Sequence, residues 1–144
     1  MTSPTKLFLS WEEIEAHTKA LSKKLKERGS WDKLVCITRG GLMPASLISR
    51  YLDIKYVDTI CLSSYDEADK QGQLEVIKEF HSTERNVLVL DDLVDTGKSF
   101  IKVKEMLPNA HLACIYAKPK GIPFINSYQI DVPQNTWIVF PWEL

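Results

Sequence analysis

One stretch of the sequence gives the strongest signal for the fold: Val87-Leu88-Val89-Leu90-Asp91-Asp92-Leu93-Val94-Asp95-Thr96-Gly97-Lys98-Ser99. Its apolar start predicts a buried strand over 86–90 that delivers two carboxylates at its carboxyl end. Small and hydroxylated residues follow, and the next apolar spacing predicts a helix over about 98–107. A buried strand that leads through a short polar loop into a helix is typical of parallel α/β sheets.

The sequence on both sides of this stretch repeats the alternation of strands and helices. Ser10 and Glu13 have the spacing of a capping box and predict a helix over about 11–28. Further strands are predicted over 34–38, 56–65, 112–117, 128–132 and 137–140, with a weaker one over 74–80 and a helix over 44–52. The chain is therefore predicted to be α/β, with a mostly parallel sheet flanked by helices and an active edge at the carboxyl ends of the strands.

Length and charge limit the class of protein. The chain has 144 residues, no repeat and no linker-like segment, so we expect one domain over 1–144. It carries 18 Lys and Arg against 19 Asp and Glu, a formal net charge of −1. That balance excludes a broadly basic nucleic-acid-binding protein, and we expect no nucleic-acid partner.

Cysteine usage and hydropathy predict the compartment. Cys36, Cys61 and Cys114 are widely spaced and lie in apolar runs, which favours buried thiols in a reducing compartment over disulfides or a zinc site. No apolar run approaches the length of a membrane span, and residues 1–9 lack a signal-like segment. We therefore expect a cytoplasmic protein without a transmembrane segment.

The loop over 95–99 has the residue types of a phosphate site. Backbone N–H groups at a helix start attract a phosphate, and the hydroxyls of Thr96 and Ser99 add donors. Gly97 permits a close approach, and Lys98 adds positive charge. The two carboxylates at 91–92 are unfavourable beside a phosphate unless Mg²⁺ or hydroxyl groups offset them. The stretch thus indicates a ligand that carries phosphate and hydroxyls together.

Two other readings of this stretch are possible. The carboxylates could simply end a strand and cap a helix. Gly97-Lys98-Ser99 also suggests a P-loop, but the first glycine of GxxxxGK[ST] would then fall at Asp92. That spacing argues against a P-loop nucleotide-hydrolysing enzyme.

The segment over 91–99 resembles the ribose-phosphate motif of the purine phosphoribosyltransferases. Four more segments are similar to the bacterial members that use xanthine and guanine, in the same order, and the similarity runs from about Trp11 to Trp142. These segments are Ile37–Pro44, Asp58–Asp66, Tyr116–Pro119 and Gln134–Trp142. The resemblance implies the type I phosphoribosyltransferase fold with a small base-binding hood.

The resemblance also implies a reaction. In this family a purine base displaces diphosphate from C1 of 5-phosphoribosyl diphosphate, which serves purine salvage. Guanine, xanthine and hypoxanthine would give GMP, XMP and IMP. A hypoxanthine-preferring enzyme of the same family remains an alternative. A nucleotide-binding regulator on the same fold is another, and it should show a basic groove for RNA.

The resemblance assigns most of the site to phosphoribosyl diphosphate. Arg39 and Gly40 would bind the diphosphate. Asp91 and Asp92 would hold the ribose hydroxyls and the Mg²⁺ environment, with Asp92 as the metal position. Asp95 would be the catalytic carboxylate beside the purine and C1. The remaining residues of the ribose-phosphate motif would be Leu93, Val94, Thr96, Gly97, Lys98 and Ser99.

Purine recognition is implied for Asp95 together with three later residues. Lys118 would donate to the oxygen at C6 of the base, because an ammonium group has only donors. Trp137 would stack on the purine, and the backbone of Ile138 would contact the base edge.

A closing loop, an assembly and a membrane contact are also implied. The loop of the family corresponds here to Tyr65–Gln73, which has Gly72 near the position where relatives carry an Arg. The family also implies a homotetramer and peripheral association with the inner membrane.

Overall fold

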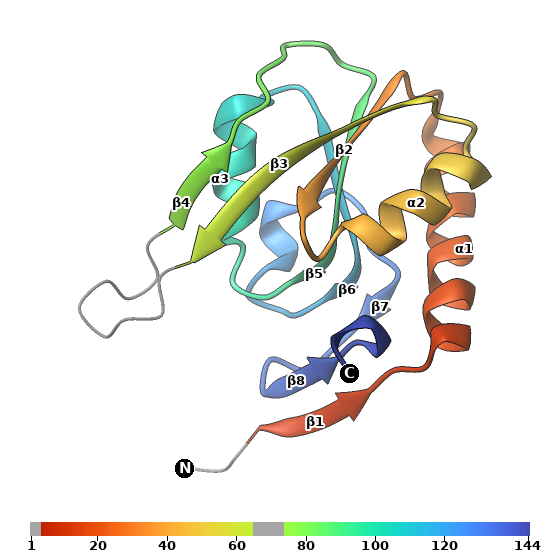
Figure 1. Ribbon diagram of the computed structural model, residues 1–144, viewed down its shortest axis with the longest axis vertical. Coiled ribbons are helices and arrows are strands. Elements are labelled where there is room, and N and C mark those ends of the chain that lie inside the picture. The colour runs from red at the N-terminus through yellow and green to blue at the C-terminus, as the bar shows by residue number, and fades with distance from the viewer. Residues whose placement is uncertain (1–3, 65–73) are drawn as a thin grey trace.

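A six-stranded sheet in the order β4-β3-β2-β5-β6-β7 organises the computed structural model, which describes residues 4–64 and 74–144 (Figure 1). Its strands are β2 (Lys33–Thr38), β3 (Tyr56–Ser64), β4 (Leu74–Lys78), β5 (Val87–Val94), β6 (His111–Ala117) and β7 (Ile130–Asp131). Only the β3–β4 pair of this sheet is antiparallel, and the others are parallel. The predicted α/β class and mostly parallel sheet are confirmed.

Helices cover both faces of the sheet, and each face has its own core. The helices α1 (Trp11–Arg28) and α2 (Leu42–Tyr51) pack on one face, where Leu34 and Cys36 of β2 join their core. The helix α3 (Lys98–Met106) covers the other face, where the alternate residues Val35 and Ile37 join a second core. Strands buried on both faces read as continuous apolar runs, which explains why 34–38 and 86–90 were recognised from sequence.

The start of α1 is stabilised by the capping box that the sequence predicts. The Glu13 N–H donates to Ser10 Oγ at 3.1 Å, and the Ser10 N–H donates to Glu13 Oε1 at 3.1 Å. The helix ends at Arg28, before Gly29 with φ of +148°. The predicted capping box and helix are both confirmed.

A second sheet joins the two ends of the chain. The strand β1 (Thr5–Phe8) pairs in parallel with β8 (Thr136–Val139), and Lys6 lies opposite Trp137 in the register. Two short 3₁₀ turns, η2 (Ile122–Phe124) and η3 (Pro141–Glu143), flank β7 and β8. Phe140 stacks on Trp142 with ring centroids 4.7 Å apart, and Phe140 also belongs to the α1–α2 core. This contact fixes β8 against the main body.

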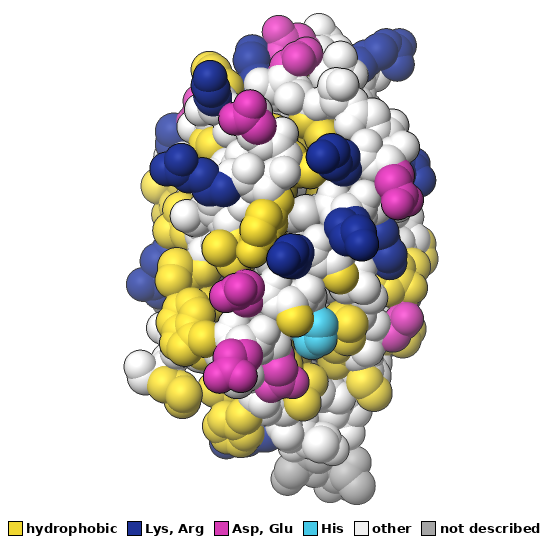
Figure 2. Space-filling model, turned by 90° about the vertical axis from the view of Figure 1, so that its right-hand side faces the viewer, with side chains coloured by type: hydrophobic (Ala, Val, Ile, Leu, Met, Phe, Trp, Pro, Cys, Tyr) yellow, Lys and Arg dark blue, Asp and Glu magenta, His cyan; other side chains and the backbone are white. Residues whose placement is uncertain are grey.

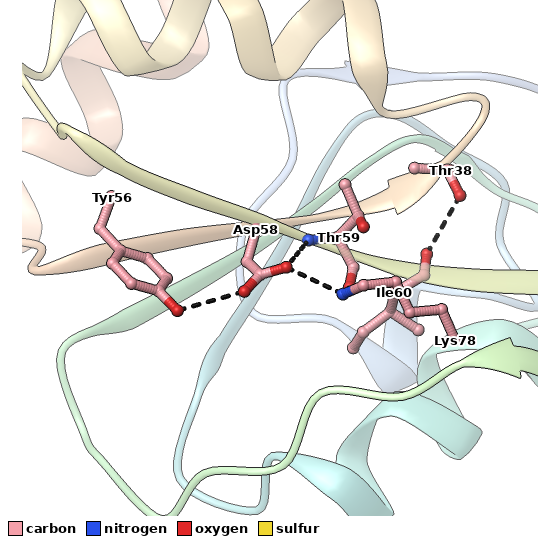
Figure 3. A network of polar contacts seen from close by, with 6 residues as sticks. All are labelled: Thr38, Tyr56, Asp58, Thr59, Ile60 and Lys78. Atoms are coloured by element: carbon pink, nitrogen blue, oxygen red, sulfur yellow. Dashed lines mark hydrogen bonds and ion pairs between the residues drawn. The ribbon is translucent and has the colours of Figure 1, made fainter.

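A polar network closes the β3–β4 edge of the sheet (Figure 3). Lys78 Nζ on β4 donates to Asp58 Oδ1 at 2.9 Å and to the Thr59 carbonyl at 2.7 Å. Tyr56 Oη and the Thr59 N–H also donate to the Asp58 carboxylate. These donors, Lys78 first, lower the pKa of Asp58. The network fixes β3, which supports β2 up to Thr38 at the start of the site.

The largest correction concerns β5. The predicted strand ended at Leu90, whereas β5 extends to Val94. Asp91 pairs with Cys114 and Leu93 with Tyr116 on β6, so the acidic pair lies within the strand. The polar Asp91-Asp92 pair suggested an end, but pairing to the long buried β6 continues the ladder. The predicted strand over 128–132 is also shorter in the structure, at Ile130–Asp131.

Candidate active site

Three loops meet at one edge of the main sheet. The strands β2, β5 and β6 are parallel neighbours, so their carboxyl ends lie at the same edge. These strands are followed by residues 39–41, 95–97 and 118–121, which include the predicted site residues Arg39, Gly40, Asp95, Thr96, Gly97 and Lys118. This edge is where ligands bind in open α/β sheets.

The Arg39-Gly40 turn lies against the acidic pair. A Cβ atom added to Gly40 would lie 2.7 Å from either carboxylate oxygen of Asp92, so only glycine fits there. The turn is fixed by the Gly41 N–H, which donates to the Ile37 carbonyl at 2.8 Å, and the Thr38–Arg39 peptide is cis. The structure therefore brings together the predicted diphosphate turn and the predicted metal carboxylate.

The acidic pair itself is partly buried. The Asp92 N–H donates to Asp91 Oδ1 at 2.8 Å. Burial raises the pKa of Asp91 well above its usual range, and the neighbouring Asp92 charge raises it further. Burial also raises the pKa of Asp92. Two adjacent carboxylates in this state are stabilised by a cation or by hydroxyl donors, which is the chemistry of a ribose–metal site.

The donor set fits a lightly held magnesium ion. Within 4–64 and 74–144, no group of three or more His, Cys, Asp or Glu side chains is placed to hold a metal. Mg²⁺ in nucleotide sites typically uses one or two carboxylates and takes its other ligands from water and substrate oxygens. Asp92, with Asp91 beside it, matches that pattern.

The loop before α3 forms a small hollow. Gly97 precedes the helix with φ of +94°, and a Cβ there would lie 2.3 Å from the ring of Phe124. Residues 93–100 line a hollow of about 140 Å³. That volume is below the roughly 300–1,000 Å³ of sites for drug-sized ligands and suits a phosphate group. A larger hollow of about 500 Å³ beside α1 contains none of the predicted site residues.

Lys118 and Asp95 form the polar centre of the edge. Lys118 Nζ lies 3.6 Å from Asp95 Oδ2, and the two side chains are 6% and 56% exposed. The Lys118 N–H donates to the Val94 carbonyl at 3.0 Å, which joins the end of β6 to the end of β5. The pair places a donor-only group beside an accessible acceptor.

Trp137 and Ile138 alternate across β8. Trp137 is 61% exposed, whereas Ile138 is 5% exposed and lies in the core. The strand therefore presents the Trp137 ring to solvent and buries the Ile138 side chain.

Sequence reasoning missed Gln134. Its Nε2 donates to Asp95 Oδ1 at 2.7 Å, and its Oε1 accepts the Lys120 N–H at 2.9 Å. Gln134 opens one of the segments that carry the resemblance, but an amide has no chemistry that marks it in sequence. The predicted closing loop, Tyr65–Gln73, lies outside the described residues.

Fold and site together define an α/β domain with a polar candidate site at the carboxyl edge of its mostly parallel sheet. The comparisons agree: residues 6–144 match the family described as the phosphoribosyl transferase domain. The chain belongs to this family, and the predicted family and type I fold are confirmed.

Individual relatives refine this membership. The chain is 43% identical over 135 residues to the xanthine-guanine phosphoribosyltransferase of Desulfotalea psychrophila, covering 94% of this chain and 84% of that protein. It is 30% identical to the purine phosphoribosyltransferase of Pyrococcus horikoshii, with a TM-score of 0.78 over 96% and 94% of the two chains. The xanthine-guanine-hypoxanthine phosphoribosyltransferase of Helicobacter pylori shares the fold at 23% identity, with a TM-score of 0.80 over 98% and 94%.

Proposed function

We propose that this protein is a purine salvage enzyme that transfers the phosphoribosyl group of 5-phosphoribosyl diphosphate to guanine and xanthine, and less well to hypoxanthine. The products are the nucleoside monophosphate and diphosphate. The Lys118–Asp95 pair at the carboxyl edge carries this proposal. The 43% identity to a xanthine-guanine phosphoribosyltransferase supports the choice of bases.

In this proposal Lys118 and Asp95 bind the base. Lys118 Nζ donates to the oxygen at C6, and it repels the amino group of adenine because an ammonium has no acceptor. Asp95 contributes its exposed carboxylate, which accepts a ring proton or stabilises positive charge at C1. The exposed ring of Trp137 stacks on the base, and the Ile138 backbone contacts the base edge.

The other loops hold phosphoribosyl diphosphate. The hollow at Thr96, Gly97, Lys98 and Ser99, with Leu93 and Val94 in its wall, takes the 5′-phosphate. Arg39 binds the diphosphate through its planar donor fork while Gly40 allows close backbone approach. Asp91 accepts from the ribose hydroxyls, and Asp92 holds Mg²⁺, which neutralises diphosphate charge when bound.

A regulator that binds RNA on the same fold is less well supported. Figure 2 looks onto the α1 side of the molecule and shows Lys and Arg side chains mixed with Asp and Glu. The face of the molecule shown in Figure 2 therefore has no continuous basic surface that would bind the phosphate backbone of RNA.

We also propose a homotetramer in the cytoplasm. Large hydrophobic side chains stay exposed on α2 and β3, among them Met43 at 40% and Tyr56 at 46%, and such surfaces are typical of subunit contacts. Light scattering should then give four times the chain mass of 16.5 kDa.

All three cysteines are free thiols, which suits a reducing compartment. In the described residues no helix is long and apolar enough to cross a membrane. Peripheral contact with the inner membrane would appear as co-flotation with vesicles of anionic lipid.

Product analysis tests the proposed function. Guanine, 5-phosphoribosyl diphosphate and Mg²⁺ should give GMP and diphosphate in equal amounts, resolved by anion-exchange chromatography. EDTA should stop the reaction, and Asp92→Asn should require more Mg²⁺ for half-maximal rate. Release of diphosphate without GMP would indicate hydrolysis and contradict the proposal.

A further inference from the structure

Gln134 connects parts of the site that belong to different strands. It lies two residues before β8, the strand that carries Trp137. Its side chain reaches Asp95, which follows β5, and Lys120, which follows β6. One amide thus joins the segment leading to the stacking tryptophan with the loop that carries the exposed carboxylate.

The orientation of this amide is determined by its partners. Lys120 presents a backbone N–H, which can only donate, so the oxygen of the Gln134 amide must face it. The NH₂ group then faces Asp95 and donates to Oδ1 at 2.7 Å, with a longer contact of 3.4 Å to the Asp95 carbonyl. The other carboxylate oxygen, Oδ2, lies 3.6 Å from Lys118 Nζ.

We propose that Gln134 is a positioning residue for catalysis, which holds the Asp95 carboxylate turned toward the base. This inference rests on the proposed function, in which Asp95 acts on the purine and C1. A donor on Oδ1 limits rotation of the carboxylate, while Oδ2 stays beside Lys118. A hydrogen bond to a carboxylate of this kind changes kcat by about 10- to 100-fold when removed.

Gln134→Glu separates this role from simple packing. The variant keeps an oxygen that accepts the Lys120 N–H but replaces the donor toward Asp95 by a carboxylate. At high pH two carboxylates then face each other, and kcat should fall about tenfold or more. As the pH falls and one proton is shared, a donor is restored, so kcat should recover toward that of the wild type.

Gln134→Ala and Asn135→Ala complete the kinetic experiment. Gln134→Ala should lower kcat about tenfold without the recovery at low pH, and KM for 5-phosphoribosyl diphosphate should stay unchanged. Asn135→Ala is the matched control, because Asn135 is the exposed neighbour in the same loop, and it should behave as the wild type. A Gln134→Glu profile that follows the wild type at every pH would overturn the proposal, as would a loss confined to KM.

A measurement without substrate checks the contact itself. The ¹⁵N–¹H resonances of the Gln134 side chain, assigned by their loss in Gln134→Glu, should shift in Asp95→Asn. Unchanged resonances would overturn the inference. Failure of the proposed function is a different result: wild-type protein would then turn over no 6-oxopurine while the resonances still shift.

Discussion

The carboxylate of Asp95 and the ammonium group of Lys118 lie 3.6 Å apart, with one side chain 56% exposed and the other 6% exposed. An ion pair with one solvated partner stabilises a fold by about 1 kcal/mol or less. Folding stability therefore does not explain why a lysine is buried at this edge. A ligand that needs a donor and an acceptor side by side does explain it.

Asp95→Asn should lower kcat for guanine by about 100- to 10,000-fold, the range for loss of a general acid or base. The amide keeps the shape of the side chain but removes the negative charge. Since Asp95 is more than half exposed, the melting temperature should change little. Steady-state kinetics with thermal unfolding as the folding control measure both effects. Near-normal turnover would remove Asp95 from the chemistry.

Lys118→Met should weaken discrimination between guanine and adenine. Methionine fills the buried volume but cannot donate to the oxygen at C6, so kcat/KM for guanine falls while adenine loses a repulsive contact. The guanine-to-adenine ratio of kcat/KM should fall at least about tenfold. Lys120→Ala is the control, because its exposed side chain lies two residues away and only its backbone contacts Gln134. An unchanged ratio in Lys118→Met would contradict the assigned role.

Asp91→Asn should stabilise the protein at neutral pH while impairing activity. Burial raises the pKa of Asp91, so the folded state binds its proton more tightly than the unfolded state does. Stability of the wild type therefore decreases as pH rises from the unfolded pKa, about 3.9, through the folded pKa. Asn mimics the protonated acid, so the variant should gain roughly 1 kcal/mol above that window and little below it. Urea unfolding in EDTA at several pH values measures this difference, and a pH-independent difference would contradict the burial argument.

Gly97→Ala should impair both folding and phosphate binding. The residue has φ of +94°, and the new methyl group would meet the Phe124 ring. The backbone conformation alone costs about 1–2 kcal/mol for a residue with a Cβ. Gly97→Ala combined with Phe124→Ala should relieve the clash but not the backbone strain. Gly29→Ala, with φ of +148° and open space around it, should lower stability while leaving KM for 5-phosphoribosyl diphosphate unchanged. Equal KM effects at Gly29 and Gly97 would contradict a phosphate site at Gly97.

Most of the fold was predictable because its signals are local. The strand over 34–38 is a continuous apolar run covered on both faces, and Ser10 with Glu13 marks the start of α1 within four residues. β1 was missed because its four residues are exposed and its partner, β8, lies at the other end of the chain. The end of β5 was misplaced because pairing with β6 overrode the polarity of Asp91 and Asp92.

The candidate site could be predicted where its residues are adjacent in sequence. The segment over 91–99 has residue types that indicate a ligand with phosphate and hydroxyl groups, whereas the Arg39-Gly40 turn was assigned through the family resemblance. Contacts across loops were not predictable in the same way. The close approach of Gly40 to Asp92 and the Gln134–Asp95 hydrogen bond depend on how parallel strands place their carboxyl ends. Their residues carry no pattern of their own.

The choice of purine base is best tested with a panel of four substrates. Initial rates are measured with guanine, xanthine, hypoxanthine and adenine, each with 5-phosphoribosyl diphosphate and Mg²⁺. Nucleotide should form from guanine and xanthine and more slowly from hypoxanthine, with no measurable product from adenine. Adenine used as well as guanine, or no product from any 6-oxopurine, would contradict it.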